Sequence, residues 1–396
     1  MSWLESEPTA QRVDEFAHRS QSENVDTIQE DSMSDIQEQV QETLDELVAS
    51  GAELGIQAAA YRDGVKVADA VAGVLAPDGP PVTPGTVFYN FSIGKGAMST
   101  LVHQEVDRGA FGYDTPLVEL WPEFGAHGKE GVTVRHVLTH TAGVPGIPLS
   151  STISDVCTWE TMIRALEDAE LWWEPGTKTG YHAYTFGYLA GEIVRRSTGL
   201  PLAEVLRERL AAPLEFADEI FFGMPEDKRG SLATLVDAPS EVDWSTMQMP
   251  DDLPMFRAAP MSLFPTADFG NNPEAIGADI PAGGKTSARA IAKMYAALLG
   301  QVDGVRLISP ERLAEAATVA VEGHDEVFGN EVRWSLGYAM GAPSVEEHSE
   351  TTFGMGGVGG GWAGADSATG TSVAVTKNLL TENFDASARV ARMVFA

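Results

Sequence analysis

The most informative stretch of the sequence is FSIGKGAMSTLV, residues 91–102. It predicts a helix that opens at Ser92 and continues through small and apolar residues. Lys95 follows three residues later on the same helix face, so its amine can reach the serine hydroxyl. A serine hydroxyl needs such a neighbour to accept or steer its proton before it acts as a nucleophile. The unpaired N–H groups and positive dipole at the helix start favour a developing oxyanion there.

The pair alone also fits a helix-capping serine followed by a surface lysine. Further motifs follow in a fixed order: LTHTAG at residues 138–143, PGTKTGY at residues 175–181, and the glycine-rich stretch TTFGMGGVGGGWAGAD at residues 351–366. In this order the sequence resembles the serine β-lactamase-like hydrolases: class C β-lactamases, D-alanyl carboxypeptidases and family VIII carboxylesterases. The resemblance extends roughly from Glu53 to Val394.

The resemblance implies catalytic roles for three residues. Ser92 is the expected nucleophile that forms an acyl-enzyme, and Lys95 holds a proton network beside it. Tyr181 is the phenol that takes the serine proton, as phenolate or in a shared-proton pair with Lys95, and returns it to the leaving group. Tyr184 is a second candidate for that base. Many relatives carry an Asn two residues after the tyrosine, whereas this chain has Ala183, which favours esters over amides.

The glycine-rich stretch implies an oxyanion and substrate site. Relatives carry K-T-G, H-x-G or W-G-G there, and Met355 occupies the Lys or His position in this chain. A thioether has no charge and no strong donor, so a β-lactam or peptide carboxylate loses its usual anchor. Gly356 and Gly357 allow close approach of the backbone. We expect the N–H groups of Val358 and Ser92 to hold the oxyanion.

Several other residues invite a functional interpretation. Lys285 begins a K-T-S triplet, which we interpret as a helix start capped by the following Thr286 or Ser287, with the preceding glycines lining the pocket. His136 and His140 have a spacing that can hold a metal, but we favour a structural role, with His140 bonding the following turn. His182 touches substrate or lies on the surface. Trp172 and Trp173 close the acyl side of the pocket or pack within the helical region.

Composition limits the partners and the environment. The chain has 396 residues, of which 43% are hydrophobic, with 26 basic and 58 acidic side chains and a net charge of -32. Nucleic acids and anionic membranes are therefore not expected partners. So acidic a chain suggests a salt-in halophile, or more simply an acidic cytosolic enzyme. The single Cys157 and the absence of a leader-like N-terminus favour a cytoplasmic location.

The order of elements predicts one α+β fold. Residues 1–33 form an acidic tail that we expect to be disordered, and residues 34–396 form the hydrolase domain. Its first helix starts with a Ser34 and Gln37 capping pair. Strands are expected at 55–61, 65–71, 332–340, 360–366 and 371–377. They give an antiparallel sheet flanked by terminal helices, with a mostly helical lobe at about 100–280 inserted, as in the β-lactamase/transpeptidase-like fold.

The sequence therefore predicts a serine hydrolase that uses neither metal nor cofactor, and most specifically a carboxylesterase for small or medium acyl esters. β-Lactamase, D-amino-acid peptidase and acyltransferase activity on the same fold are the alternatives. A non-catalytic binding protein with a decayed site is the alternative from another class. The oligomeric state is not predicted.

Overall fold

The computed structural model describes residues 35–239, 250, 252–343 and 349–396. The predicted acidic tail and the Ser34 cap lie outside the described residues. A helix over residues 35–49 opens the described part, and α13 (Asp385–Phe395) closes it. None of the helices in the described ranges is long and apolar enough to cross a membrane.

An eight-stranded antiparallel sheet forms the frame, in the order β2-β1-β12-β11-β10-β9-β8-β7. Every residue of β12 is buried, as are all but the last of β1, because these strands lie inside the sheet and are covered on both faces. In chain order the strands are β1 Gly55–Arg62, β2 Val65–Gly73, β7 Val321–His324, β8 Glu331–Trp334, β9 Ala339–Met340, β10 Thr352–Gly356, β11 Trp362–Asp366 and β12 Thr371–Lys377.

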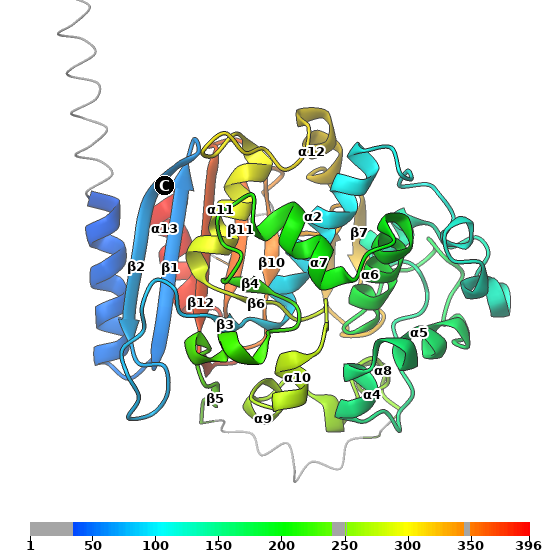
Figure 1. Cartoon of the computed structure of the whole chain (residues 1–396), viewed down its shortest axis with the longest axis horizontal. Helices are drawn as coiled ribbons and strands as arrows, with labels where there is room; N and C mark the ends of the chain where they lie inside the picture. The colour runs from blue at the N-terminus through cyan, green and yellow to red at the C-terminus, as the bar shows by residue number, and fades with distance from the viewer. Residues whose placement is uncertain (1–34, 240–249, 251, 344–348) are drawn as a thin grey trace, which may run out of the picture.

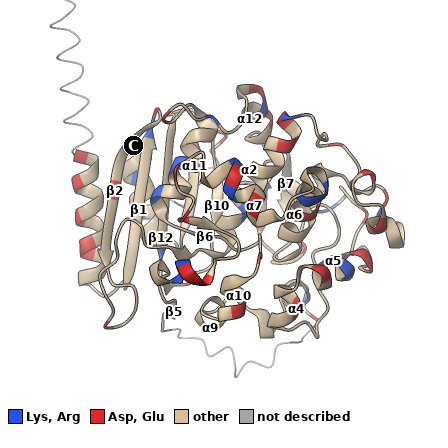
Figure 2. Ribbon diagram, in the orientation of Figure 1, with Lys and Arg blue, Asp and Glu red and all other residues tan. Residues whose placement is uncertain are grey.

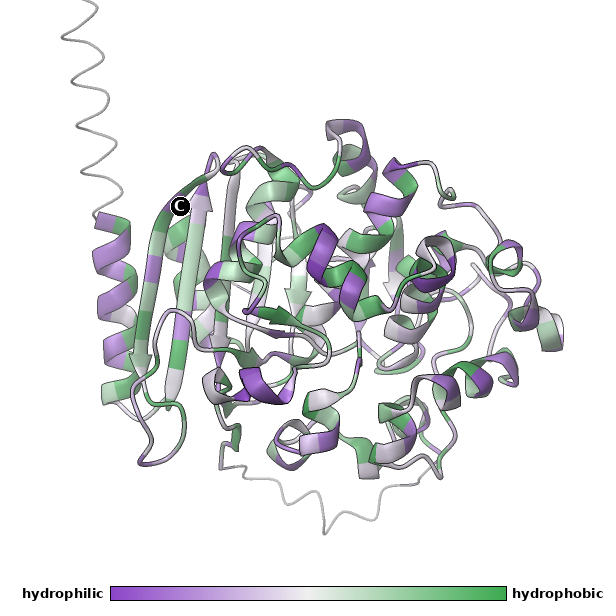
Figure 3. Cartoon of the chain, in the orientation of Figure 1, coloured by the Kyte–Doolittle hydropathy of each residue, from purple (hydrophilic) through white to green (hydrophobic). Residues whose placement is uncertain are grey.

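Helices cover both faces of this sheet (Figure 1). The helix at 35–49 and α13 (Asp385–Phe395) pack on one face, where Val373 and Val375 of β12 join a cluster with Val40 and Val390. Ala374 points to the opposite face and joins the larger core that contains α11 (Ala288–Leu299). This alternation along β12 is the period of two that a strand covered on both faces requires. Green apolar and purple polar residues alternate on the helix at 35–49 in Figure 3, as expected for a helix with one buried face.

The inserted part is mostly helical and lies beside the sheet (Figure 1). Its helices are α2 Gly94–Asp107, α3 Val134–Leu138, α4 Ile153–Cys157, α5 Trp159–Glu167, α6 Thr185–Thr198, α7 Leu202–Leu206, α8 Pro254–Ala258, α9 Ala267–Gly270 and α10 Pro273–Gly277, and α12 Pro310–Ala316 follows α11. Two small sheets connect the parts: β3 Phe88–Tyr89, β6 Lys285–Thr286 and β4 Ile220–Phe221 form one, and β13 Leu379–Leu380 pairs with β5 Val236–Asp237 in the other.

Charge follows this layering. Figure 2 shows acidic residues concentrated on the peripheral helices, while the strands of the sheet carry few charged residues. Unlike the peripheral helices, α2 is buried along almost its whole length. It carries Lys95 into the interior, between the sheet and the inserted helices.

The predicted fold is confirmed, with two local corrections. The expected strand at 332–340 is interrupted: β8 and β9 are separate, and the turn between them contains Gly337 at φ 88°, a conformation that favours glycine. The helix expected to open at Ser92 begins at Gly94, and Ser92 lies in the preceding 3₁₀ turn η1 (Phe91–Ile93).

Candidate active site

Ser92 and Lys95 meet at the start of α2. Lys95 Nζ donates a hydrogen bond to Ser92 Oγ at 3.0 Å and a longer one to the Ala282 carbonyl at 3.4 Å. The lysine is fully buried, and desolvation lowers its pKa to about 7. A large share of this amine is therefore neutral near pH 7 and able to accept a proton from the serine.

The backbone before Ser92 is strained. Phe91 has φ 45°, which is uncommon for a residue with a side chain and costs about 1–3 kcal/mol. Two hydrogen bonds hold this turn: Asn90 N–H donates to the Gly284 carbonyl at 2.8 Å, and Gly284 N–H donates to the Phe91 carbonyl at 2.9 Å. Gly284, directly before β6, therefore holds the turn that carries Ser92.

Tyr181 lies against the same lysine. Lys95 Nζ is 4.7 Å from the centre of the Tyr181 ring, and the ring stacks on Trp334 with centres 5.8 Å apart and planes 15° apart. Burial raises the pKa of Tyr181, and a hydrogen bond with Ser92 opposes that rise. The phenol is therefore neutral and holds its proton. Of the two forms that the resemblance implies for Tyr181, the phenolate is therefore disfavoured, and Lys95 is the better proton acceptor.

A buried carboxylate positions Tyr181. Asp325 accepts a hydrogen bond from Tyr181 N–H at 2.9 Å, and its other oxygen accepts from Val327 and Phe328 N–H at 2.8 Å each. It ties the Tyr181 loop to the chain before β8. Sequence reasoning missed Asp325, because it belongs to none of the motifs and is 144 residues away from its partner.

His140 packs under Tyr181, with ring centres 4.8 Å apart. Its Nδ1 accepts a hydrogen bond from His182 N–H at 3.1 Å, which places the proton of the neutral ring on Nε2. That buried Nε2 has no hydrogen-bond partner among the described residues and faces aromatic rings. The expected bond to the following turn is therefore wrong, because the partner comes from the Tyr181 loop.

The two expectations for His182 are also wrong. It is fully buried, with Nε2 accepting from Val144 N–H at 3.2 Å and Nδ1 bonded to the Gly180 carbonyl at 2.7 Å. It therefore supports the loop. His136 accepts from Thr133 N–H within a helix cap. Within the described ranges no three His, Cys, Asp or Glu side chains gather in a way that could hold a metal ion.

The glycine-rich stretch reaches Ser92 from the end of β10. A side chain at Gly357 would meet the Asn90 carbonyl oxygen at 2.2 Å, so only glycine allows this approach. Val358 follows and lines the same cavities as Ser92. Neither the Ser92 nor the Val358 N–H donates a hydrogen bond to any described residue, and both remain available to an oxyanion.

Met355 lies apart from the other predicted residues. It is buried within β10, paired with Ala363, and it lines neither of the cavities that contain Ser92. The expectation that it faces substrate is not supported, because the backbone reaches the cavity only from Gly356 onward.

Two cavities meet at Ser92. One has a volume of about 120 Å³ and is lined by apolar groups that include Ala183 and Gly283, while the other measures about 490 Å³ and extends along Gly356, Gly357 and Val358. Tyr184 also lines the smaller cavity, but its hydroxyl donates to the Leu263 carbonyl at 2.5 Å. It is therefore held away from Ser92.

A family model described as Beta-lactamase matches residues 40–396. The chain belongs to the beta-lactamase family. The resemblance inferred from the ordered motifs is thereby confirmed, and so is the fold.

Relatives within the beta-lactamase family include proteins named as esterases. The chain is 34% identical over 277 residues to the Esterase/beta-lactamase LipL of Mycobacterium tuberculosis, covering 64% of this chain and 61% of LipL. The chain thus spans less than two thirds of that relative. A solved family VIII carboxylesterase superimposes with a TM-score of 0.82 at 28% identity, covering 91% of this chain and 97% of that one. A solved penicillin-binding protein homologue from Caulobacter crescentus superimposes with a TM-score of 0.81 at 28% identity, and it covers the same shares of the two chains.

In this beta-lactamase family chain, the K-T-S triplet is structural. Ser287, one of the two expected caps, accepts from Ala290 N–H at the start of α11. Lys285 is fully buried in β6 and donates to the Phe222 carbonyl.

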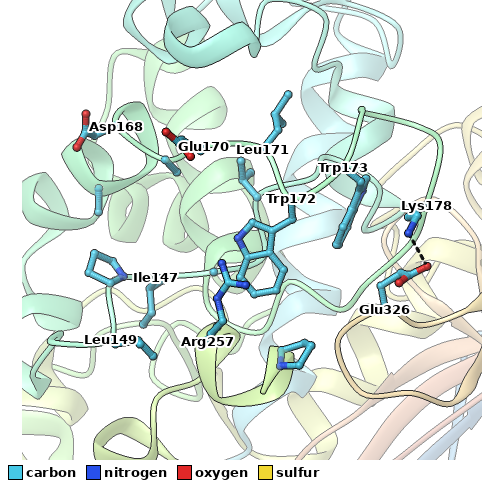
Figure 4. Close-up of a pocket in the computed structure, with 16 residues that line it drawn as sticks. Ile147, Leu149, Asp168, Glu170, Leu171, Trp172, Trp173, Lys178, Arg257 and Glu326 are labelled. Atoms are coloured by element: carbon cyan, nitrogen blue, oxygen red, sulfur yellow. Dashed lines mark ion pairs between the residues drawn. The ribbon is translucent and has the colours of Figure 1, made fainter. Parts of the chain in front are cut away.

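The tryptophan pair lines a third cavity (Figure 4), and Ser92 is not among the described residues that line it. This cavity has a volume of about 530 Å³. The Arg257 guanidinium stacks on Trp172, 4.1 Å from its ring centre, and Lys178 pairs with Glu326 at 3.2 Å. Trp173 packs with Ala258 and Val327. The tryptophans therefore pack the helical region and do not close the Ser92 cavities.

Proposed function

We propose that this chain is a serine hydrolase, and most specifically a carboxylesterase that forms an acyl-enzyme on Ser92 with small or medium acyl esters. The observation that carries the proposal is the 3.0 Å contact between Lys95 Nζ and Ser92 Oγ, made by a buried amine whose pKa is lowered to about 7. Such a pair supplies the activated nucleophile that acyl transfer needs.

In the proposed reaction, neutral Lys95 takes the proton of Ser92 Oγ as this oxygen bonds to the ester carbonyl carbon. The carbonyl oxygen becomes an oxyanion held by the N–H groups of Ser92 and Val358. The C–O bond to the alcohol then breaks, and the proton passes from Lys95, through the Tyr181 hydroxyl, to the departing oxygen. Water attacks the acyl-enzyme by the same route in reverse order, releasing the acid and regenerating Ser92.

Three features support esters as substrates. Ala183 lines the smaller cavity at the position where many relatives place an amide-recognising asparagine. No Lys or Arg is among the described residues that line either Ser92 cavity, so no cationic side chain there pairs with the carboxylate of a β-lactam or peptide. The solved carboxylesterase carries an esterase name, and the name of LipL gives esterase together with beta-lactamase.

We propose further that the enzyme works in concentrated salt, because its net charge is -32. The single Cys157 supports a cytoplasmic location for it. Carboxylates on the surface repel one another in dilute solution, and salt screens that repulsion. Activity that rises between dilute and molar potassium chloride supports this part, and a steady fall over the same range contradicts it.

Labelling with a fluorophosphonate tests the proposal, because this reagent reacts far faster with an activated serine than with other side chains. We expect one adduct on the peptide that contains Ser92, and none in Ser92→Ala or in heat-denatured protein. Folded wild-type protein without an adduct would support a non-catalytic binding protein instead.

A further inference from the structure

The LTHTAG motif at residues 138–143 takes no part in the proposed chemistry, yet it lies against the segment that carries Tyr181. The Thr141 carbonyl accepts a hydrogen bond from Gly176 N–H at 3.0 Å. His140, one residue earlier, bonds to the segment closer to Tyr181, across 42 residues of sequence. The contact between the two motifs therefore reaches the residue that relays the proton.

Three consecutive backbone N–H groups hold the chain at Tyr181. The N–H of Gly180 donates to the His140 carbonyl at 3.1 Å, and the N–H of His182 donates to His140 Nδ1, also at 3.1 Å. The N–H of Tyr181 itself donates to Asp325 at 2.9 Å. His140 thus accepts a hydrogen bond on each side of Tyr181, and the backbone of Tyr181 cannot turn without breaking one of the three bonds.

The double contact depends on the backbone conformation of His140. Its φ is 58°, in the left-handed region, where few residues other than glycine are found. Asn, Asp and His adopt this conformation more readily than other residues with a side chain. In His140 it directs the carbonyl and the imidazole to the same segment, since one accepts from Gly180 and the other from His182.

The imidazole of His140 is suited to this role. It is fully buried, and desolvation lowers its pKa well below the usual value, so the ring stays neutral and Nδ1 keeps the lone pair that accepts the bond. The ring also packs against Tyr181 and Trp334, with ring centres 4.8 and 4.5 Å away. His140 therefore contacts both the backbone and the side chain of the Tyr181 segment.

We infer that His140 is a positioning residue, which holds the Tyr181 hydroxyl where it passes the proton from Lys95 to the departing alcohol oxygen. The inference rests on the proposed esterase function. His140 is not among the described residues that line either Ser92 cavity, so it acts through Tyr181 and not on the substrate. A displacement of about 1 Å in a catalytic geometry can lower a rate by about a hundredfold. Loss of the Nδ1 contact should therefore lower kcat and leave KM nearly unchanged.

Two amide substitutions test the acceptor at Nδ1. His140→Asn keeps an acceptor oxygen as close to the backbone as Nδ1 and tolerates the left-handed conformation, whereas His140→Gln carries its amide one bond further out. With p-nitrophenyl butyrate, we expect kcat within about threefold of wild type for His140→Asn and about tenfold or more below it for His140→Gln. Equal losses in the two variants, a larger loss in His140→Asn, or a change confined to KM overturns the inference.

A double-mutant cycle tests whether His140 acts through the Tyr181 hydroxyl. Tyr181→Phe removes that hydroxyl, so His140→Gln then has no relay left to displace. We expect kcat of the double variant to lie within about threefold of Tyr181→Phe alone. A general loss of structure would instead multiply the two single losses, and that result overturns the inference. Should His140→Gln not fold, His140→Ala takes its place in the cycle.

His103→Gln is the matched control. His103 is also fully buried, and its Nδ1 lies 2.7 Å from the Tyr113 hydroxyl, but it is not among the described residues that line the Ser92 cavities. We expect a lower unfolding temperature with kcat within about threefold of wild type. A loss of kcat in His103→Gln as large as that in His140→Gln would mean that kcat reports on burial alone, and it overturns the inference.

The same data separate the inference from the esterase proposal. Folded wild-type protein that hydrolyses no ester contradicts the proposed function itself. Wild-type hydrolysis with equal kcat in His140→Asn and His140→Gln leaves the esterase standing and removes only the role of His140.

Discussion

Two lysines in this molecule share the same physical environment. Lys95 in α2 and Lys285 in β6 are both fully buried, and desolvation lowers the pKa of each to about 7. Each amine also lies over a tyrosine ring, Lys95 at 4.7 Å from the centre of Tyr181 and Lys285 at 4.3 Å from that of Tyr89. By burial and pKa alone the two sites are equivalent.

Their hydrogen-bond partners distinguish them. Lys95 contacts the hydroxyl of Ser92, which opens onto two cavities, whereas Lys285 donates to the backbone carbonyl of Phe222 and lies near the Asp279 carboxylate. A carbonyl oxygen has no proton to give, so Lys285 can only hold structure together. A shifted pKa therefore identifies a candidate, and the neighbouring group determines whether chemistry follows.

Replacing each lysine by methionine tests this contrast with the largest expected effect. Lys95→Met should lower kcat/KM by about a thousandfold or more, because the serine loses its proton acceptor. Lys285→Met should keep kcat/KM within about threefold, since it touches no reacting atom. Ester turnover is measured on proteins whose circular dichroism matches the wild type. Equal losses of kcat/KM in the two variants would contradict the different roles assigned to Lys95 and Lys285.

Two tyrosines near Ser92 allow a second comparison of the same kind. Tyr181→Phe should lower kcat by about a hundredfold or more, because the hydroxyl that relays the proton is lost. Tyr184→Phe should change kcat by about threefold at most, since its hydroxyl is engaged with the Leu263 carbonyl and not with Ser92. Steady-state kinetics with one short ester checks both. A larger loss in Tyr184→Phe would reassign the proton relay.

The pH profile tests which lysine is titrated. Lys95 must be neutral to accept a proton and its pKa is about 7, so kcat/KM should fall about tenfold per pH unit below that value and level off above it. Lys285→Met should show the same midpoint, although Lys285 has a similar pKa. A flat profile between pH 6 and 8, or a midpoint that moves in Lys285→Met, contradicts the assignment.

Salt has the smallest expected effect, and it acts on the surface more than on the buried amines. Raising potassium chloride from 0.1 to 2 M shortens the screening length from about 10 Å to below about 3 Å. Thermal unfolding should therefore shift upward by about 5 °C or more as the acidic surface is screened. The midpoint of the pH profile should stay nearly constant. A midpoint that follows the salt concentration would mean that Lys95 is open to solvent.

The sequence predicted the features that depend on short-range order. The Ser92 and Lys95 contact follows from their spacing, and the strands at 55–61 and 371–377 follow from runs of small and β-branched residues. The features it did not predict depend on distant contacts. The strained φ of Phe91 is held by Gly284, and the burial of His182 comes from the packing of its loop against Val144.

The directions of the pKa shifts of Lys95 and Tyr181 could not be predicted from the sequence. The pKa of Lys95 falls and that of Tyr181 rises because both are buried by elements far apart in the chain, which no local pattern reports. For Met355 the sequence predicted a contact that the structure does not support. A position in a familiar motif suggested contact with substrate, but in β10 the residue lies before the backbone reaches the cavity.

We propose above all that Ser92 is the nucleophile of an esterase. It is tested most directly by following p-nitrophenyl butyrate and a chromogenic cephalosporin side by side, for wild type and Ser92→Ala, in molar potassium chloride. Ester hydrolysis by the wild type should be lost in Ser92→Ala, with little cephalosporin cleavage by either protein. Ester hydrolysis that survives in Ser92→Ala, or folded wild-type protein inactive on both substrates, would contradict it.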